Sequence, residues 1–216
     1  MESEYIVKGM GVFLVQGVVA GTGDRSYRCC AGSIGSGHLY QSEREFAPML
    51  ARLLRYDGST MTPSELQAYL RTHIPLSAAM QVEVESAEWD HVLLRAPLAP
   101  NINHRDTVFG GSASALSILA AWSLLHVRLR SSGIASRLVI QSNRMDYLRP
   151  IGGSFSARSS LEEADQWPGF LRLLERRGRA RLTVTADLMG EGDVAGLFSG
   201  EFVALGYGNA STDGGG

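Results

Sequence analysis

The sequence predicts an α+β fold in which a curved antiparallel sheet wraps around one long central helix. Residues 110–130 are apolar almost all round a helix, so this helix must be largely enclosed. A hairpin pattern precedes it at residues 81–96, and residues 179–188 alternate strictly between polar and apolar, as a half-exposed antiparallel strand does. Because a helix and a sheet with apolar faces must bury them against each other, these observations together favour the wrapped arrangement.

The composition is that of a soluble globular protein, with 44% hydrophobic and 19% charged residues among 216. The formal net charge of -2 supplies no field to attract nucleic acid, so a nucleic-acid partner is not expected. Cys29 and Cys30 are adjacent and cannot easily bridge each other, which suits a reducing cytoplasm. The five histidines lack the spacing of metal ligands, so neither a metal nor another cofactor is expected.

Two apolar runs raise the question of a membrane. Acidic residues precede the run at residues 10–21, and Gln16 interrupts it. Both features favour a buried strand over a signal peptide. Residues 113–129 contain Ser123, His126 and Arg128, which a membrane span rarely tolerates. No membrane partner is therefore expected.

The chain is predicted to have an N-terminal α/β extension of unknown role at residues 1–60, a principal domain at 61–206 and a flexible glycine-rich tail at 207–216. The extension is expected to hold a strand at 12–20, a second possible strand around Tyr27 and a helix near 44–55. Its loop at residues 32–37 lacks the order of a phosphate-binding motif and is interpreted as a plain turn.

The principal domain begins with a helix that ends near His73. Thr62 can cap this helix, Pro63 suits its first turn, and Glu65 occupies the acidic position of a capping box. A turn at residues 88–90 then joins two strands into the hairpin. The elements expected after the central helix are strands at 137–148, 154–160, 179–188 and 194–205, with a helix near 168–176.

Four segments carry a family resemblance: IPLSAAM at residues 74–80, LRAPLAPNINH at 94–104, TVFGGS at 107–112 and YLRP at 147–150 with two glycines following. They resemble the putative thioesterase family typified by the carboxy-terminal domain of YiiD, over roughly residues 65–206. The resemblance implies a hotdog fold and a homodimer or higher homo-oligomer, with ligand tunnels between the central helix of one subunit and the strands of the other. It also implies hydrolysis of an acyl thioester of CoA or of an acyl carrier protein.

Gly110 and Gly111 open the central helix and are candidate catalytic residues. Unpaired backbone N–H groups and the positive end of the helix dipole meet whatever binds there, and the oxygen of an attacked thioester becomes negative. Glycine lets the backbone approach closely. The alternative is that the pair serves only tight packing of the helix against a strand.

Asn103, His104 and Asp106 precede that helix and are the other candidate catalytic residues, to orient a water or remove its proton, with Asp106 the better base. Broader hotdog thioesterases carry a histidine before the glycines and an acid two turns into the helix, where this sequence has Phe109 and Ile118. Either Asp106 and His104 substitute, or the chemistry differs or is lost. Alternatively, the three loop residues merely satisfy backbone amides or face solvent.

Five residues are predicted to contact substrate: Phe109, Ser112, Ser114, Tyr147 and Arg149. Tyr147 and Arg149 are placed to line the tunnel mouth and bind a pantetheine or nucleotide phosphate, although Arg149 can equally be a surface residue paired with an acid. The serines have no Gly-x-Ser-x-Gly elbow and can be simple packing hydroxyls.

Two other functions compete with hydrolysis. A dehydratase, decarboxylase or related enzyme acting on a carrier-bound polyketide or fatty acyl intermediate would use the same tunnel. A non-catalytic acyl or carrier-protein binding module belongs to a different class, and the missing histidine and helix acid favour it.

Overall fold

The computed structural model describes residues 5–7, 13–15, 61–161 and 166–206. The chain divides into two compact units, residues 1–49 and 50–216. In the first unit, strands β1 (Tyr5–Val7) and β2 (Phe13–Val15) pair antiparallel. β2 falls within the predicted strand at 12–20, whereas β1 was not predicted. The strand around Tyr27, the helix near 44–55 and the tail at 207–216 lie outside the described residues.

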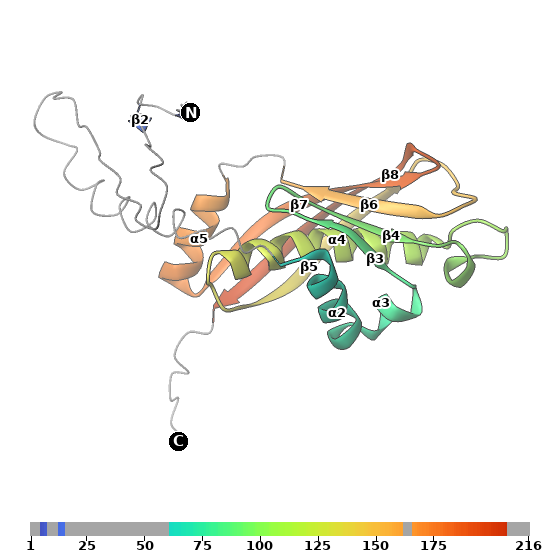
Figure 1. The fold of residues 1–216 in the computed structure, drawn as a ribbon, viewed down its shortest axis with the longest axis horizontal. Coiled ribbons are helices and arrows are strands. Elements are labelled where there is room, and N and C mark those ends of the chain that lie inside the picture. Colours follow the sequence, from blue (N-terminus) through green and yellow to red (C-terminus); the bar gives the residue numbers. More distant parts are fainter. Residues whose placement is uncertain (1–4, 8–12, 16–60, 162–165, 207–216) are drawn as a thin grey trace, which may run out of the picture. The chain divides into compact units, whose positions relative to one another are not determined.

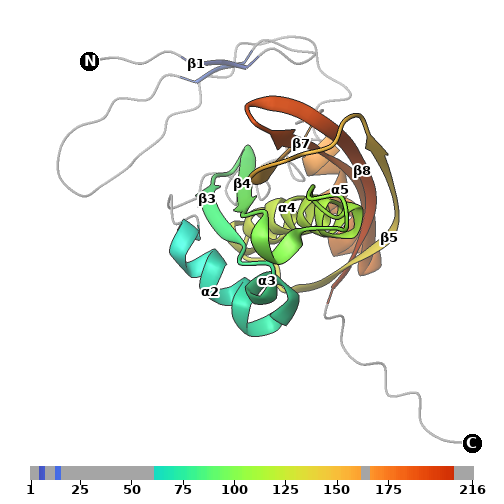
Figure 2. The same cartoon turned by 90° about the vertical axis from the view of Figure 1, so that its right-hand side faces the viewer.

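The second unit is a six-stranded antiparallel sheet around the helix α4 (Gly110–Ser131), in the strand order β3-β4-β6-β7-β8-β5. The strands are β3 (Glu83–Ala87), β4 (His91–Ala96), β5 (Ser136–Tyr147), β6 (Phe155–Ser160), β7 (Arg179–Gly190) and β8 (Asp193–Gly206). Viewed close to the axis of α4, the sheet curves around the helix from β3 to β5 (Figure 2). This confirms the predicted fold class and the hotdog arrangement.

Two helices before the sheet, α2 (Pro63–His73) and α3 (Pro75–Ala79), lie beside α4 (Figure 1). The predicted capping box is confirmed, because Thr62 Oγ1 accepts from the Glu65 N–H at 3.3 Å and the Glu65 carboxylate accepts from the Thr62 N–H at 2.8 Å. α3 and the 3-10 helix η1 (Ala99–Asn101) were not predicted. The helix α5 (Gln166–Arg177) spans the predicted helix near 168–176.

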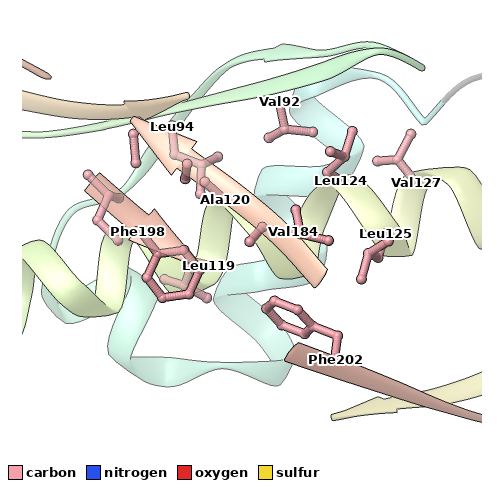
Figure 3. Close-up of a cluster of buried hydrophobic side chains, with 14 of the residues drawn as sticks. Val92, Leu94, Leu119, Ala120, Leu124, Leu125, Val127, Val184, Phe198 and Phe202 are labelled. Atoms are coloured by element: carbon pink, nitrogen blue, oxygen red, sulfur yellow. The ribbon is translucent and has the colours of Figure 1, made fainter. Parts of the chain in front are cut away.

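The core lies between α4 and the concave face of the sheet. The alternation in β7 is confirmed, since its apolar residues from Ala180 to Leu188 are buried and its polar partners face outward. Leu119 and Leu124 of α4 belong to the same buried cluster as Val184, Phe198 and Phe202 from the sheet (Figure 3). α4 is long and apolar enough to cross a membrane by length and composition, but 67% of its most apolar window is buried here, as expected of a core helix.

The buried cation Arg128 lies in the last turn of α4. Its guanidinium lies 4.4 Å from the ring of Trp89 and 4.8 Å from the ring of Trp167, so it packs between the β3–β4 turn and α5. Burial lowers the pKa of Arg128 to about 10, which leaves it charged near neutral pH. Arg128, the charged residue within the apolar run, therefore links α4 to the β3–β4 turn and to α5.

His126 joins α4 to α2 through aromatic stacking. Its ring lies 4.7 Å from Trp122 and 4.5 Å from Tyr69, and its buried Nε2 has no hydrogen-bond partner within the described residues. Burial, followed by the charges of Arg130 and His73, lowers the pKa of His126 to about 4.

This environment predicts a loss of stability in mild acid. The folded pKa lies below the unfolded value of 6.5, so the contribution of neutral His126 is complete above pH 6.5 and is lost as the pH falls toward 4. Allowing for solvent screening, we expect the free energy of unfolding to drop by about 1 kcal/mol more in the wild type than in His126→Phe between pH 7 and pH 5. Urea unfolding of both proteins at the two pH values measures this difference, and an identical drop would refute the assignment to His126.

Candidate active site at the start of the central helix

A pocket of about 350 Å³ lies at the N-terminal end of α4. Its lining residues are Val108, Gly110, Ala113, Tyr147, Leu148, Arg149, Pro150, Ile151 and Leu188. Most of this wall is apolar, as is usual for a site that takes an organic ligand. Three predicted site residues, Gly110, Tyr147 and Arg149, are among the residues that line it.

Backbone and side-chain hydrogen bonds join the two walls of the pocket. The Val108 N–H donates to the Ile151 carbonyl at 2.8 Å, and the Tyr147 hydroxyl donates to the Gly110 carbonyl at 2.8 Å. The segment after β5 is thus joined at both ends to the segment that enters α4. These bonds bring together residues that lie about 40 positions apart in the sequence.

The start of α4 offers backbone donors to a ligand. No side chain caps the helix at Phe109, and the Ala113 N–H is the first to donate back to the Phe109 carbonyl, at 3.0 Å. The N–H groups of residues 110–112 have no partner within the described part of the chain, as is usual in a first helical turn. With the helix dipole behind them, these groups favour a negative or partly negative oxygen.

The two glycines have different surroundings. A Cβ at Gly110 would lie 3.5 Å from the Tyr147 ring, an ordinary contact. A Cβ at Gly111 would collide with the Phe109 ring, whose Cζ would lie 2.9 Å away. Gly111 is therefore needed to accommodate Phe109 in its observed position, and Phe109 itself is 56% exposed. The sequence alone did not reveal this contact.

Asn103 organises the loop before the helix. Its Oδ1 accepts from the Arg105 N–H at 2.7 Å and the Thr107 N–H at 3.4 Å, while its Nδ2 donates to the Thr107 hydroxyl and to the Val108 carbonyl. These bonds match the alternative in which Asn103 satisfies loop amides. The side chain still lies in the predicted loop, with both of its polar atoms engaged.

His104 and Asp106 are exposed in the same loop, outside the residues that line the pocket. The Arg105 Nε donates to His104 Nε2 at 3.4 Å. Asp106 has a φ of 58°, in the left-handed region, and its backbone N–H donates to the Asn103 carbonyl at 3.2 Å. The carboxylate of Asp106 therefore stands on a tight turn at the entrance to α4.

Of the remaining predicted residues, Arg149 lines the pocket and the two serines do not. Arg149 is both a pocket residue and a surface residue, since its Nη1 donates to Asp193 Oδ2 at 3.1 Å. Ser112 and Ser114 are half-buried in the first turns of α4 and are not among the lining residues. Ile118, at the position where the broader hotdog thioesterases were expected to carry an acid, is partly buried and packs against the core. No acid therefore stands at this position of the helix.

The apolar wall of the pocket was not predicted from the sequence; it is formed by Val108, Ala113, Leu148, Pro150, Ile151 and Leu188. Leu188 belongs to the alternation of β7, and nothing in that pattern separates a core position from a pocket position. Buried Asn101 was also not predicted: its side-chain Nδ2 donates to the carbonyls of Met80 and Pro97, and its backbone carbonyl accepts from the Phe109 N–H at 2.7 Å. Among the described residues, no cluster of three or more His, Cys, Asp or Glu is placed to hold a metal ion.

Comparison with solved structures identifies proteins of the same fold. A protein of unknown function from Chlorobaculum tepidum is 28% identical and has a TM-score of 0.64, with 68% of this chain and 99% of that chain covered. A "putative thioesterase" from Shewanella oneidensis is 24% identical, with a TM-score of 0.60 over 66% of this chain and 96% of that one. A "probable thioesterase" of unknown function from Pseudomonas aeruginosa is 22% identical, with a TM-score of 0.59 over 69% of this chain and 100% of that one.

The sequence profile of the family described as "Putative thioesterase (yiiD_Cterm)" matches residues 63–206. That range includes the whole sheet, α4 and the pocket at its start. The chain therefore belongs to this putative thioesterase family of hotdog-fold proteins, and hydrolysis of acyl thioesters is the activity that the family description carries.

Proposed function

We propose that this protein hydrolyses an acyl thioester of CoA or of an acyl carrier protein, bound in the pocket at the start of α4. The observation that carries the proposal is the combination of an apolar pocket of about 350 Å³ with uncapped backbone N–H groups at the start of a 22-residue helix. The apolar wall suits an acyl chain or a pantetheine arm, and the N–H groups suit the thioester carbonyl oxygen.

In the proposed reaction, a water molecule attacks the thioester carbonyl carbon. The carbonyl oxygen becomes negative, and fixed N–H donors at the start of α4 stabilise that charge better than mobile water would. Asp106 takes the proton of the attacking water, since its exposed carboxylate stands in the loop that enters the helix. The carbon–sulfur bond then breaks, the thiol leaves with a proton, and the carboxylic acid is released.

The test is incubation of the purified chain with a panel of acyl-CoA and acyl-carrier thioesters, followed by mass analysis and titration of free thiol. Hydrolysis releases acid and thiol in equal amounts. Loss of water from the acyl group with no thiol release would indicate a dehydratase instead, and loss of carbon dioxide a decarboxylase. Measurable binding without turnover would support the binding module and overturn the proposed hydrolysis.

We also propose that the working unit is a homodimer or a higher homo-oligomer whose subunits meet along β5. This strand is an edge of the sheet, and it carries the exposed side chains Val139 and Tyr147, with Leu148 just beyond. An exposed edge strand with apolar side chains is a surface that proteins normally cover. Such an interface would place the pocket beside the partner subunit, because Tyr147 and Leu148 also line it.

The expected solution mass is at least twice the chain mass of 23.3 kDa, as measured by light scattering. Val139→Arg, on the β5 edge, should shift the equilibrium toward monomer because it places a charge on the apolar strand. Leu173→Arg is the matched control, since this side chain is 38% exposed on α5. A wild-type protein that is strictly monomeric would contradict the shared site.

A further inference from the structure

The hydroxyl of Tyr147 hydrogen-bonds to the backbone of α4 and to no other side chain among the described residues. It donates a hydrogen bond of 2.8 Å to the Gly110 carbonyl, in the first turn of α4. That carbonyl and the Gly111 N–H belong to one planar peptide unit. The Gly111 N–H lies among the first-turn donors that have no partner in the described part of the chain. Tyr147 therefore contacts the carbonyl of the same peptide unit whose N–H is available to a ligand.

Two physical effects follow from this hydrogen bond. The bond restricts rotation of the peptide plane, at a place where two glycines and an uncapped helix start leave the backbone unusually free. It also draws electron density toward the carbonyl oxygen, so the N–H of the same peptide becomes a stronger donor. A carbonyl has two lone pairs, so Gly110 can accept from Tyr147 without losing its bond within the helix.

The backbone around Tyr147 is itself held in place. The Leu148 N–H donates to the Ala195 carbonyl at 2.9 Å, and the Arg149 side chain is paired with Asp193 at 3.1 Å. These bonds fix the end of β5 against β8. The hydrogen bond from Tyr147 thus connects the start of α4 to backbone that is held in place at the edge of the sheet.

We propose that Tyr147 is a positioning residue for the thioesterase reaction, which orients and polarises the Gly110–Gly111 peptide so that the Gly111 N–H meets the carbonyl oxygen of the bound thioester. The inference rests on the proposed function. It gives Tyr147 a role through the backbone, in addition to its place in the pocket wall. Because the tyrosine is 55% exposed, loss of its hydroxyl should cost little folding stability.

The test compares the wild type with Tyr147→Phe, which removes only the hydroxyl. We expect kcat to fall roughly tenfold, less than the 10²-fold or greater loss for complete removal of such a donor, while KM and Tm stay unchanged. Tyr69→Phe is the matched control, because it removes a hydroxyl from α2, outside the residues that line the pocket. Tyr147→Leu, which also removes the ring from the pocket wall, should raise KM in addition.

A second readout does not depend on turnover. In the ¹⁵N-labelled protein, the amide resonance of Gly111 should move upfield in Tyr147→Phe and stay in place in Tyr69→Phe. An active wild type with unchanged kcat in Tyr147→Phe overturns the inference, as does a Gly111 resonance that does not move. If the wild type hydrolyses no thioester, the proposed function fails; a shifted Gly111 resonance would then still support the positioning contact, and an unshifted one would refute it separately.

Discussion

Gly111→Val is expected to lower turnover of an acyl thioester by roughly 100-fold or more, the usual weight of an oxyanion donor, while the protein stays folded at assay temperature. The valine side chain has to occupy the start of α4, where the thioester oxygen is proposed to meet the backbone. It must also displace the ring of Phe109, because the new Cβ would overlap the Cε1 of that ring. Since Phe109 is 56% exposed, the ring can swing outward, and we expect a stability loss of about 1 to 3 kcal/mol.

Turnover and melting have to be measured together, with two further variants. Gly152→Val is the matched control, because a Cβ there meets only the Glu191 carboxylate, at 3.7 Å. The double variant Phe109→Ala/Gly111→Val removes the clash, so it should regain stability but not turnover. Recovery of turnover in the double variant would assign the loss to movement of Phe109. Full activity in a folded Gly111→Val protein would show that the thioester does not meet the helix at Gly111.

Asp106→Asn is expected to lower turnover by about two orders of magnitude with the fold and ligand affinity retained, the usual weight of a general base. Asparagine suits this test because it tolerates the left-handed backbone that Asp106 adopts, with φ at 58°. The backbone bond from residue 106 to the Asn103 carbonyl does not involve the side chain and should remain. The substitution therefore removes the basic carboxylate and leaves the loop in place.

The matched control is Asp187→Asn, which makes the same change on the exposed outer face of β7. Steady-state kinetics give kcat and KM, and a binding assay with a non-hydrolysable thioether analogue gives the affinity. An unchanged rate would sink the assignment of Asp106 as the base and leave Asp106 as a turn residue of the loop.

Part of the candidate site could be predicted from the sequence, and part of it could not. Gly110 and Tyr147 stand in motifs that the resemblance identified, and both line the pocket. Ile151 and Leu188 line it as well, but each is an ordinary apolar residue in sequence, and only the fold brings them beside Gly110. Asn103 stood in the predicted loop, yet its four hydrogen bonds depend on where the loop turns.

Local sequence patterns predicted most elements of the principal domain. A capping box at Thr62, an apolar helix at 110–130 and an alternation at 179–188 each act through neighbours a few residues away, so local patterns predict them. The five-residue helix α3 escaped prediction because so short an element has too few residues to show a period.

The atoms that meet at the start of the central helix are brought together by the packing of distant segments. The collision that makes Gly111 necessary involves the rotamer of Phe109, and the bond from Tyr147 to Gly110 joins residues 37 positions apart. Such contacts arise when a sheet edge docks on a helix, and their geometry is set by packing of the whole core. The pocket and its donors are therefore properties of the folded chain, built from side chains whose local patterns predict only strands, turns and a helix.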